Sequence, residues 1–262
     1  SKDGPLNRGR GCVKGMSIIE QMYHPQRLIY PQKRIGARGS GQWQRISWEE
    51  AYDTIAERMN CLIREYGPEC ISALTGTGRH HLPYFFRMGN AIGTPNFSSA
   101  GGLICLGPRR TGAVMTGGLF AGVDYFGPVR PGGILVWGAN PAVSGADGEL
   151  QWFIKDAARE GIPMVVVDPK PNELTRQAKY WLRIRPGTDG ALALGILNIL
   201  IQENLYDRDF VEHYTYGFDA LRERCKEYDV ERVARITDIP AAEILAAARW
   251  IGTTKPLGLE QG

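Results

Sequence analysis

The sequence predicts an α/β protein in which parallel strands carry helices on both faces. Runs of apolar, mostly β-branched residues at 134–137 and 164–167 are typical of buried strands. Helical patterns follow them at 148–159 and 191–203, so that strands alternate with helices. This alternation favours parallel βαβ units closed by right-handed crossovers, as in Rossmann-like domains.

The part of the chain before these units is expected to be less regular. Residues 1–44 are rich in turn-forming residues and include an extended stretch at 28–31. Ser47, with Glu50 three residues later, forms a capping-box pattern that predicts a helix ending near Gly67. The other elements expected before residue 100 are a strand at 71–74, a glycine loop at 76–78 and a helix at 84–92.

The last third of the chain is expected to be mainly helical. A third strand is predicted at 181–184 and a further one begins at 257–259. Between them the helices expected are 218–228, 230–236 and 241–251, with Pro240 in the first turn of the last one.

The two ends of the chain indicate a fragment of a larger protein. Ser1 is not a methionine, and the sequence stops just after a strand begins. We expect residues 1–46 to be the remnant of an iron–sulfur domain and its lead-in. Residues 47–100 are expected to start a first α/β domain, and 101–262 to form a second, truncated one.

Composition excludes several classes of protein. The chain has 262 residues, 43% of them hydrophobic and 23% charged, with a net charge of +3. It has no basic tract that would indicate nucleic-acid binding, and no apolar run long enough to be a transmembrane segment. Its five cysteines are irregularly spaced and do not suggest a disulfide framework. We expect a soluble prokaryotic protein that is located in either the cytoplasm or the periplasm.

Three loops lie where open α/β sheets bind ligands, beyond the carboxyl ends of strands. They are residues 138–141, 168–170 and 186–190. Asp168 is suited to hold a ribose hydroxyl or a purine edge, but equally to stabilise a turn. Thr188 or Asp189 opens a helix, and taken alone either is more simply explained as its cap than as a ligand contact. The occurrence of all three loops in order favours a nucleotide-containing cofactor.

Two cysteines are candidate metal ligands. Cys12 lies in a Gly-rich turn with Lys14, where a thiolate cluster ligand would sit beside a fixed cation, yet no CxxC partners precede it. Cys105 lies among glycines and is either a small buried hydrophobic residue or a thiolate ligand. Cys61 and Cys70 are expected in the core.

Together these motifs resemble the molybdenum/tungsten bis-pterin guanine dinucleotide oxidoreductases, the dimethyl sulfoxide reductase superfamily. The resemblance runs through essentially the whole chain. It implies that Cys12 is the last ligand of a [4Fe-4S] cluster whose other three ligands are missing from the chain. It also implies that Lys14 is a buried cation between cluster and pterin, and that Cys105 binds Mo or W, which makes these two the expected catalytic residues.

The resemblance also assigns the cofactor contacts. The residues expected near the pterin are Gly76, Gly78 and Arg79. The residues expected to hold one guanine dinucleotide are Trp137, Gly138, Asn140, Pro141, Asp168, Pro169, Gly187, Thr188 and Asp189.

The function that the resemblance implies is two-electron redox chemistry on a small molecule, with electrons passing through the cluster. A ferredoxin-like electron-transfer subunit is the expected partner, and the chain alone is expected to have no turnover. Leu106 after Cys105 looks closer to the acetylene hydratase branch, so a tungsten-dependent, non-redox hydratase is the alternative. A non-catalytic scaffold that has lost the site is disfavoured, because such a protein would not need Cys105 or Lys14. An NAD dehydrogenase is disfavoured because no GxGxxG motif follows any predicted strand.

Overall fold

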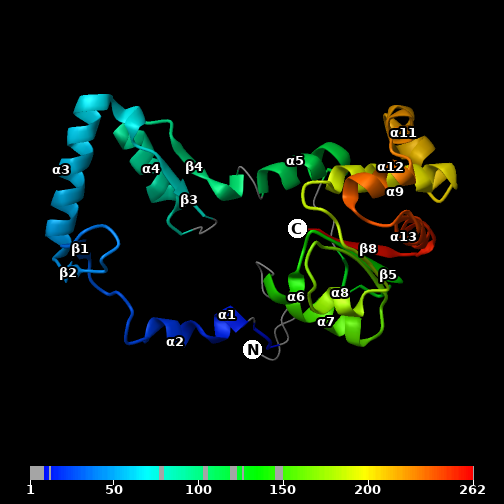
Figure 1. Ribbon diagram of the computed structural model, residues 1–262, viewed down its shortest axis with the longest axis horizontal. Coiled ribbons are helices and arrows are strands. Elements are labelled where there is room, and N and C mark those ends of the chain that lie inside the picture. Colours follow the sequence, from blue (N-terminus) through cyan, green and yellow to red (C-terminus); the bar gives the residue numbers. More distant parts are fainter. Residues whose placement is uncertain are drawn as a thin grey trace. The chain divides into compact units, whose positions relative to one another are not determined.

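A computed structural model describes residues 9–11, 13–76, 80–102, 106–118, 123–125, 127–144 and 150–261. The chain forms two compact units (Figure 1). The first unit is Ser1–Met16 together with Ala121–Gly262, and the second is Ser17–Phe120. Within the described residues, none of the helices has the length and apolar character needed to cross a membrane.

A parallel sheet of four strands forms the centre of the first unit. The strands are β5 (Gly133–Trp137), β6 (Met164–Val167), β7 (Tyr180–Leu182) and β8 (Leu257–Gln261). Their spatial order is β7-β6-β5-β8, so the last strand of the chain lies beside β5. The sequence predictions of strands at 134–137, 164–167 and 257–259 are confirmed, and the third strand lies at 180–182 instead of 181–184.

Helices cover both faces of this sheet (Figure 1). The helices of the first unit are α1 (Val13–Met16), α6 (Pro141–Ser144), α7 (Leu150–Arg159), α8 (Glu173–Gln177), α9 (Asp189–Gln202), α10 (Arg208–Tyr214), α11 (Phe218–Lys226), α12 (Val230–Thr237) and α13 (Ala241–Thr253). One core packs the sheet against α9, α12 and α13, and the other packs it against α7 and α8. Helices on both faces of a parallel sheet were predicted, and the structure confirms them.

The alternation of side chains along β5 explains the two cores. Ile134 and Val136 belong to the core under α7, whereas Leu135 belongs to the core under α9. All three are buried, and burial of each such side chain contributes about 1.5–3 kcal/mol. A strand buried on both faces needs this continuous apolar run, which is why the strand was recognisable in the sequence.

The second unit is built from short elements. They are α2 (Ile18–Met22), β1 (Gln32–Arg34), β2 (Trp43–Arg45), α3 (Trp48–Tyr66), a 3-10 turn η1 (Pro68–Cys70), β3 (Ala73–Thr75), α4 (Leu82–Ile92), β4 (Phe97–Ser99) and α5 (Leu106–Thr116). Strands β1 and β2 pair antiparallel, and β3 and β4 pair parallel.

Several local predictions for the second unit needed correction. The stretch at 28–31 has no regular secondary structure, as the loop-rich prediction implies, but the hairpin β1–β2 that follows it was not predicted. Only half of the predicted capping box forms: the Ser47 hydroxyl accepts the Glu50 N–H at 3.0 Å, while the Glu50 carboxylate pairs with Lys33 at 3.3 Å. Helix α5 was missed because Gly107, Pro108 and Gly112 weaken the helical pattern of its sequence.

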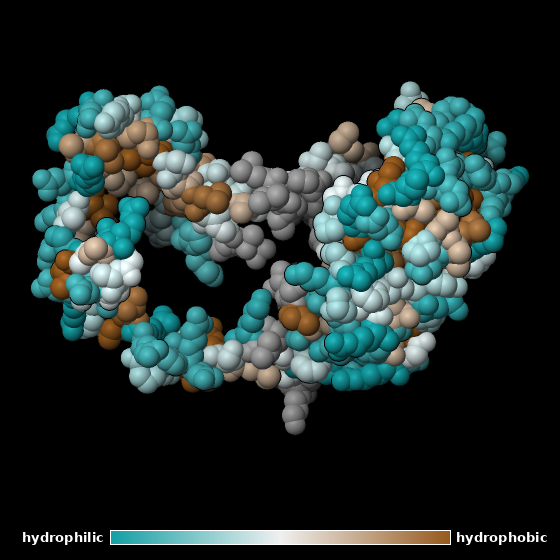
Figure 2. Space-filling model, in the orientation of Figure 1, coloured by the Kyte–Doolittle hydropathy of each residue, from teal (hydrophilic) through white to brown (hydrophobic). Residues whose placement is uncertain are grey.

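The second unit has little internal core. None of its described apolar side chains is buried, and Figure 2 shows apolar side chains at the surface around α3 and α4. On α3, Tyr52 is 63% and Ile55 is 56% exposed. Since burial of apolar surface is the main driving force of folding, this unit gains little stability from its own contacts.

Candidate functional site

The loops predicted to bind a nucleotide leave the sheet from one edge. Trp137 pairs in register with Val167, and Val167 with Leu182, so β5, β6 and β7 end together. The first residues of two loops are tied to the neighbouring strands: the Gly138 N–H donates to Val167 O at 3.1 Å, and the Asp168 N–H to Leu182 O at 3.3 Å.

One hydrogen bond joins the end of β5, directly before the first loop, to the third loop. Trp137, the last residue of β5, donates its indole Nε1–H to Oδ1 of Asp189, the first residue of α9, at 2.9 Å. The backbone φ angles of Gly138 and Gly187 are +61° and +83°. Residues with a side chain adopt this left-handed region only at a cost, so glycine is favoured at both bends.

A pocket of about 590 Å³ opens beside this hydrogen bond. Its polar or loop residues are Trp137, Gly138, Asp189, Gly190 and Gln261. The rest of its lining is aliphatic: Leu135, Ala193, Ile196, Leu197, Leu200, Ile251 and Leu259. The volume is within the range of small-molecule and cofactor pockets, about 300–1,000 Å³. The N-terminus of α9, a helix of 14 residues, adds a positive dipole end there, which favours anionic groups.

The third loop is held by its own hydrogen bonds. Thr188 occupies the N-cap position of α9, but its side chain makes no capping bond. Its hydroxyl instead donates to Arg185 O at 2.6 Å, and Asp189 accepts from Trp137. The structure therefore does not support the interpretation of either side chain as a simple helix cap.

Asp168 stabilises the turn in which it lies. Its Oδ1 accepts the Lys170 N–H at 2.7 Å and its Oδ2 accepts the Asn172 side-chain amide at 2.9 Å. Its carbonyl oxygen accepts the Trp181 indole N–H at 2.8 Å. Of the two roles expected for Asp168, these contacts therefore match that of a turn residue.

The structure brings together only part of the predicted site. Within the described part of the chain, the residues that line the 590 Å³ pocket include Trp137, Gly138 and Asp189 but not Asn140, Pro141, Asp168, Pro169, Gly187 or Thr188. Gly76 directly follows β3 in the second unit. Cys12, Gly78, Arg79 and Cys105 lie outside the described residues.

Lys14 is exposed in this structure, and its expected place between cluster and pterin stays a prediction. Helix α1 is a single turn, and the described side chains around it, at 14–30, are exposed throughout. Cys70 is also exposed and Cys61 is half-buried, so Cys70 does not belong to a core, whereas Cys225 is fully buried. The described residues contain no group of three or more His, Cys, Asp or Glu side chains suited to hold a metal ion.

Gln261 is a candidate site residue that sequence reasoning missed. It is the last residue of β8, pairs in register with Trp137 and lines the pocket. The available signal was the rule that ligands lie beyond the carboxyl ends of strands, but the neighbour of β8 in the sheet could not be read from the sequence.

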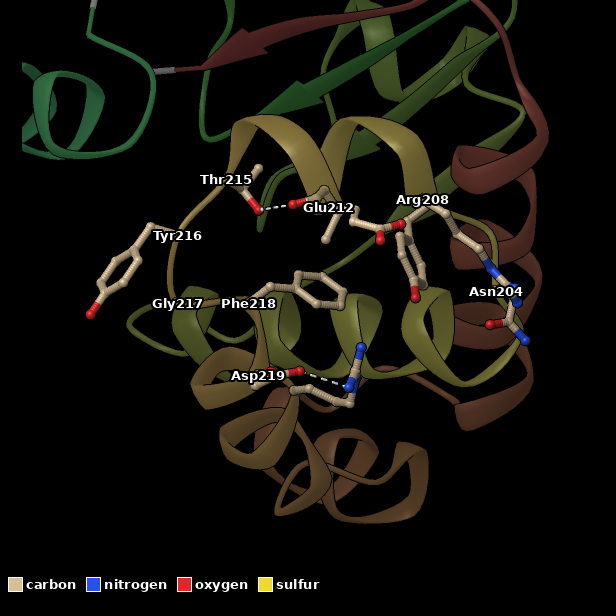
Figure 3. A pocket seen from close by; sticks show the side chains of 11 residues that line it. Asn204, Arg208, Glu212, Thr215, Tyr216, Gly217, Phe218 and Asp219 are labelled. Carbon is tan, nitrogen blue, oxygen red and sulfur yellow. Dashed lines mark hydrogen bonds and ion pairs between the residues drawn. The ribbon is translucent and has the colours of Figure 1, made fainter.

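A second pocket, of about 810 Å³, lies between the loop that follows α9 and helices α10 and α11 (Figure 3). The Phe218 ring points into it, and Tyr216 points away into solvent. Arg222 pairs with Asp219 at 2.8 Å and its guanidinium carbon lies 4.9 Å from the Phe218 ring centre. None of the expected catalytic and cofactor residues that the structure describes lines this pocket.

The fold is that of an α/β protein, and the candidate site lies at the edge of the sheet where open parallel sheets bind ligands. Residues 27–254 match the family model described as molybdopterin oxidoreductase. The chain belongs to this family.

The relatives include redox enzymes and a hydratase. The chain is 37% identical to the probable oxidoreductase YoaE of Bacillus subtilis, over 97% of the chain and 37% of the relative. It is 32% identical to the dimethyl sulfoxide reductase DmsA of Escherichia coli, over 98% of the chain and 35% of the relative. It is 34% identical to the acetylene hydratase of Syntrophotalea acetylenica, over 95% of the chain and 34% of the relative.

A solved structure supports the fold. The acetylene hydratase from Pelobacter acetylenicus matches with a TM-score of 0.72 and 32% identity, over 96% of the chain and 34% of the solved chain. The chain thus spans about a third of the length of the relatives that it matches.

Proposed function

We propose that the pocket at the end of β5 holds the guanine nucleotide of a molybdenum or tungsten bis-pterin guanine dinucleotide cofactor. We further propose that the full-length protein is the catalytic subunit of a molybdopterin-dependent oxidoreductase. The observation that carries the proposal is the hydrogen bond between Trp137 and Asp189, which joins the end of β5 to the start of α9 at the pocket.

The side chains at the pocket fit a guanine nucleotide. A carboxylate has two oxygens and about four acceptor sites, so Asp189 can accept a guanine N–H while it accepts the Trp137 indole. The Trp137 ring offers a flat surface for the purine. Glycine at 138 lets the backbone approach a phosphate, and the α9 N-terminus favours its charge.

The other residues of the three loops would complete the nucleotide site. These are Asn140, Pro141, Asp168, Pro169, Gly187 and Thr188, with Gly76, Gly78 and Arg79 toward the pterin. Cys105 would bind the metal, Cys12 would be one ligand of a [4Fe-4S] cluster, and Lys14 would place a positive charge between cluster and pterin. When bound, the cofactor would supply two-electron redox chemistry at the metal. A ferredoxin-like subunit would accept or deliver the electrons.

A hydratase is the second candidate. It is favoured by the similarity to acetylene hydratase, both in sequence and in the solved structure. Such an enzyme would add water to its substrate without net redox change.

Elemental analysis tests both functions. The full-length protein is purified anaerobically, its Mo, W and Fe are measured, and the nucleotide released by acid is identified by chromatography. Mo or W with released GMP would support the cofactor, and about four iron atoms per chain would support the cluster. W with hydration and no electron transfer would favour the hydratase, whereas a protein without Mo, W and GMP would contradict both.

A further inference from the structure

Asp238 ends helix α12 in an unusual backbone conformation. Its φ is +60°, and its N–H closes the helix by donating to Ala234 O at 3.0 Å. A residue with a side chain adopts this left-handed region at a cost in free energy that glycine avoids. The contacts of the Asp238 side chain offer a reason for the choice of residue.

The carboxylate of Asp238 holds Arg185 in a two-point ion pair. Arg185 Nε donates to Oδ2 at 2.8 Å and Nη2 donates to Oδ1 at 2.5 Å. The Arg185 backbone N–H donates to Thr237 O at 2.9 Å. Thr237 is fully buried and its hydroxyl donates to Val233 O at 2.8 Å, so this anchor is fixed in the core.

Arg185 is also the first residue of the loop that leads to the pocket. Its carbonyl oxygen accepts from Thr188 twice, from N at 3.3 Å and from Oγ1 at 2.6 Å. The next residue, Asp189, accepts from Trp137 and lines the pocket. The loop is therefore held at one end by Asp238 and at the other by Trp137.

We propose that Asp238 is a positioning residue, which through Arg185 fixes the 185–189 loop and so raises the affinity of the pocket for a guanine nucleotide. This inference rests on the proposed function of the pocket. It concerns a residue that does not itself line the pocket, so its effect on binding comes through Arg185 and the loop.

Simple electrostatics makes the opposite prediction. Asp238 places a negative charge beside a loop proposed to meet phosphates, so its removal should strengthen nucleotide binding if charge dominated. The two side chains of the pair are 52% and 60% exposed, and salt at physiological concentration screens such charges over about 8 Å. Loss of the loop anchor should therefore outweigh loss of the charge.

The test measures GMP affinity and thermal stability of the full-length protein prepared without cofactor. The variants are Asp238→Gly, Asp238→Asn and Arg185→Lys, and the matched control is Glu203→Gln. Glu203 forms a comparable pair with Arg249, at 2.9–3.0 Å, beyond the other end of α9, about 20 Å away along the helix.

We expect GMP affinity to fall about fivefold in both Asp238 variants and in Arg185→Lys, the scale of one well-formed surface ion pair. Glu203→Gln should bind GMP like the wild type. In Asp238→Gly the melting temperature should stay level or rise, because glycine relieves the strained φ. A fall in affinity without a fall in stability is an effect that a purely structural role would not produce.

Each contrary result is informative. If the wild type binds GMP and the Asp238 variants bind it equally or more tightly, the positioning role is wrong while the proposed function stands. If Glu203→Gln weakens binding as much, the effect is general and the positioning role is wrong. If the wild type binds no GMP, the proposed function is wrong and this inference fails with it.

Discussion

The indole N–H of Trp137 donates to the carboxylate of Asp189, although the two residues are 52 positions apart in the sequence. The bond connects the end of a buried strand to the start of a helix, at the edge of the sheet where open α/β folds bind ligands. It fixes Asp189 relative to the end of β5 at the proposed nucleotide site.

Trp137→Phe tests the contribution of this bond. The ring is kept and the N–H is lost, so Asp189 is no longer held in place. Since a hydrogen bond to a charged group contributes about 1.5–3 kcal/mol, GMP affinity should fall at least about tenfold, measured by calorimetry.

The control for this variant is Trp152→Phe. Trp152 also donates its indole N–H, to Gly11 O at 3.1 Å, but it lies on α7, which packs on the opposite face of the sheet. It should not change GMP affinity. Equal losses in the two variants would contradict a specific role for Trp137.

The packing of α9 against α12 predicts a large effect at Gly195. A Cβ built there would lie 2.6 Å from Cγ2 of Val233, which is fully buried and stiff because it is β-branched. Gly195→Ala should therefore destabilise the protein by about 1–3 kcal/mol in urea unfolding.

Gly190→Ala is the matched change in the same helix. A Cβ at Gly190 meets no atom within 4 Å, so better helix propensity should leave stability unchanged or slightly raised. A Gly195→Ala variant as stable as this control would show that α12 can move away at little cost.

The ion pair between Glu203 and Arg249 predicts a pH dependence. The hydrogen bond from Arg249 lowers the pKa of the Glu203 carboxyl below its usual range. A carboxyl with a lowered folded-state pKa adds stability above its unfolded-state pKa, about 4.3, and loses it as the pH falls through the folded-state value. Wild type should therefore be more stable than Glu203→Gln at pH 7, and the difference should shrink as the pH falls below about 4.3 and disappear below the lowered folded-state pKa. A difference that persists unchanged at pH 3, in thermal melts at both values, would contradict this account.

Cys225 should react slowly with thiol reagents. It is fully buried, and burial raises the pKa of its thiol. Because the thiolate is the reactive form, iodoacetamide at pH 8 should leave Cys225 unmodified in the folded protein and modify it in urea, as followed by peptide mass spectrometry. Rapid labelling without urea would indicate that α11 opens readily.

The second unit should be the less protected part of the chain. None of its described apolar side chains is buried, whereas the first unit has two packed cores. In chain 1–262, amide hydrogens of α3 and α4 should exchange much faster than those of β5, β6 and α9. Equal protection of the two units would show that α3 and α4 are covered.

The sequence by itself determined the strands and most long helices of the first unit. The run at 164–167 is short, apolar and mostly β-branched, which is typical of a strand buried on both faces, and the structure places β6 there. The same reasoning located the loops after β5 and β6, because a loop must follow each strand. The domain division at 46 and 100 and the roles of Cys12, Lys14 and Cys105 stay predictions.

Only the tertiary structure decided which of these residues meet. Strand order is a long-range property, so the sequence did not show that β8 lies beside β5 and brings Gln261 next to Trp137. The sequence also did not show which partner each carboxylate binds. The Asp168 carboxylate accepts a hydrogen bond from its own loop, whereas the Asp189 carboxylate accepts one from Trp137. A sequence pattern reports what each residue does with its near neighbours, and a binding site is made by contacts between residues far apart in the chain.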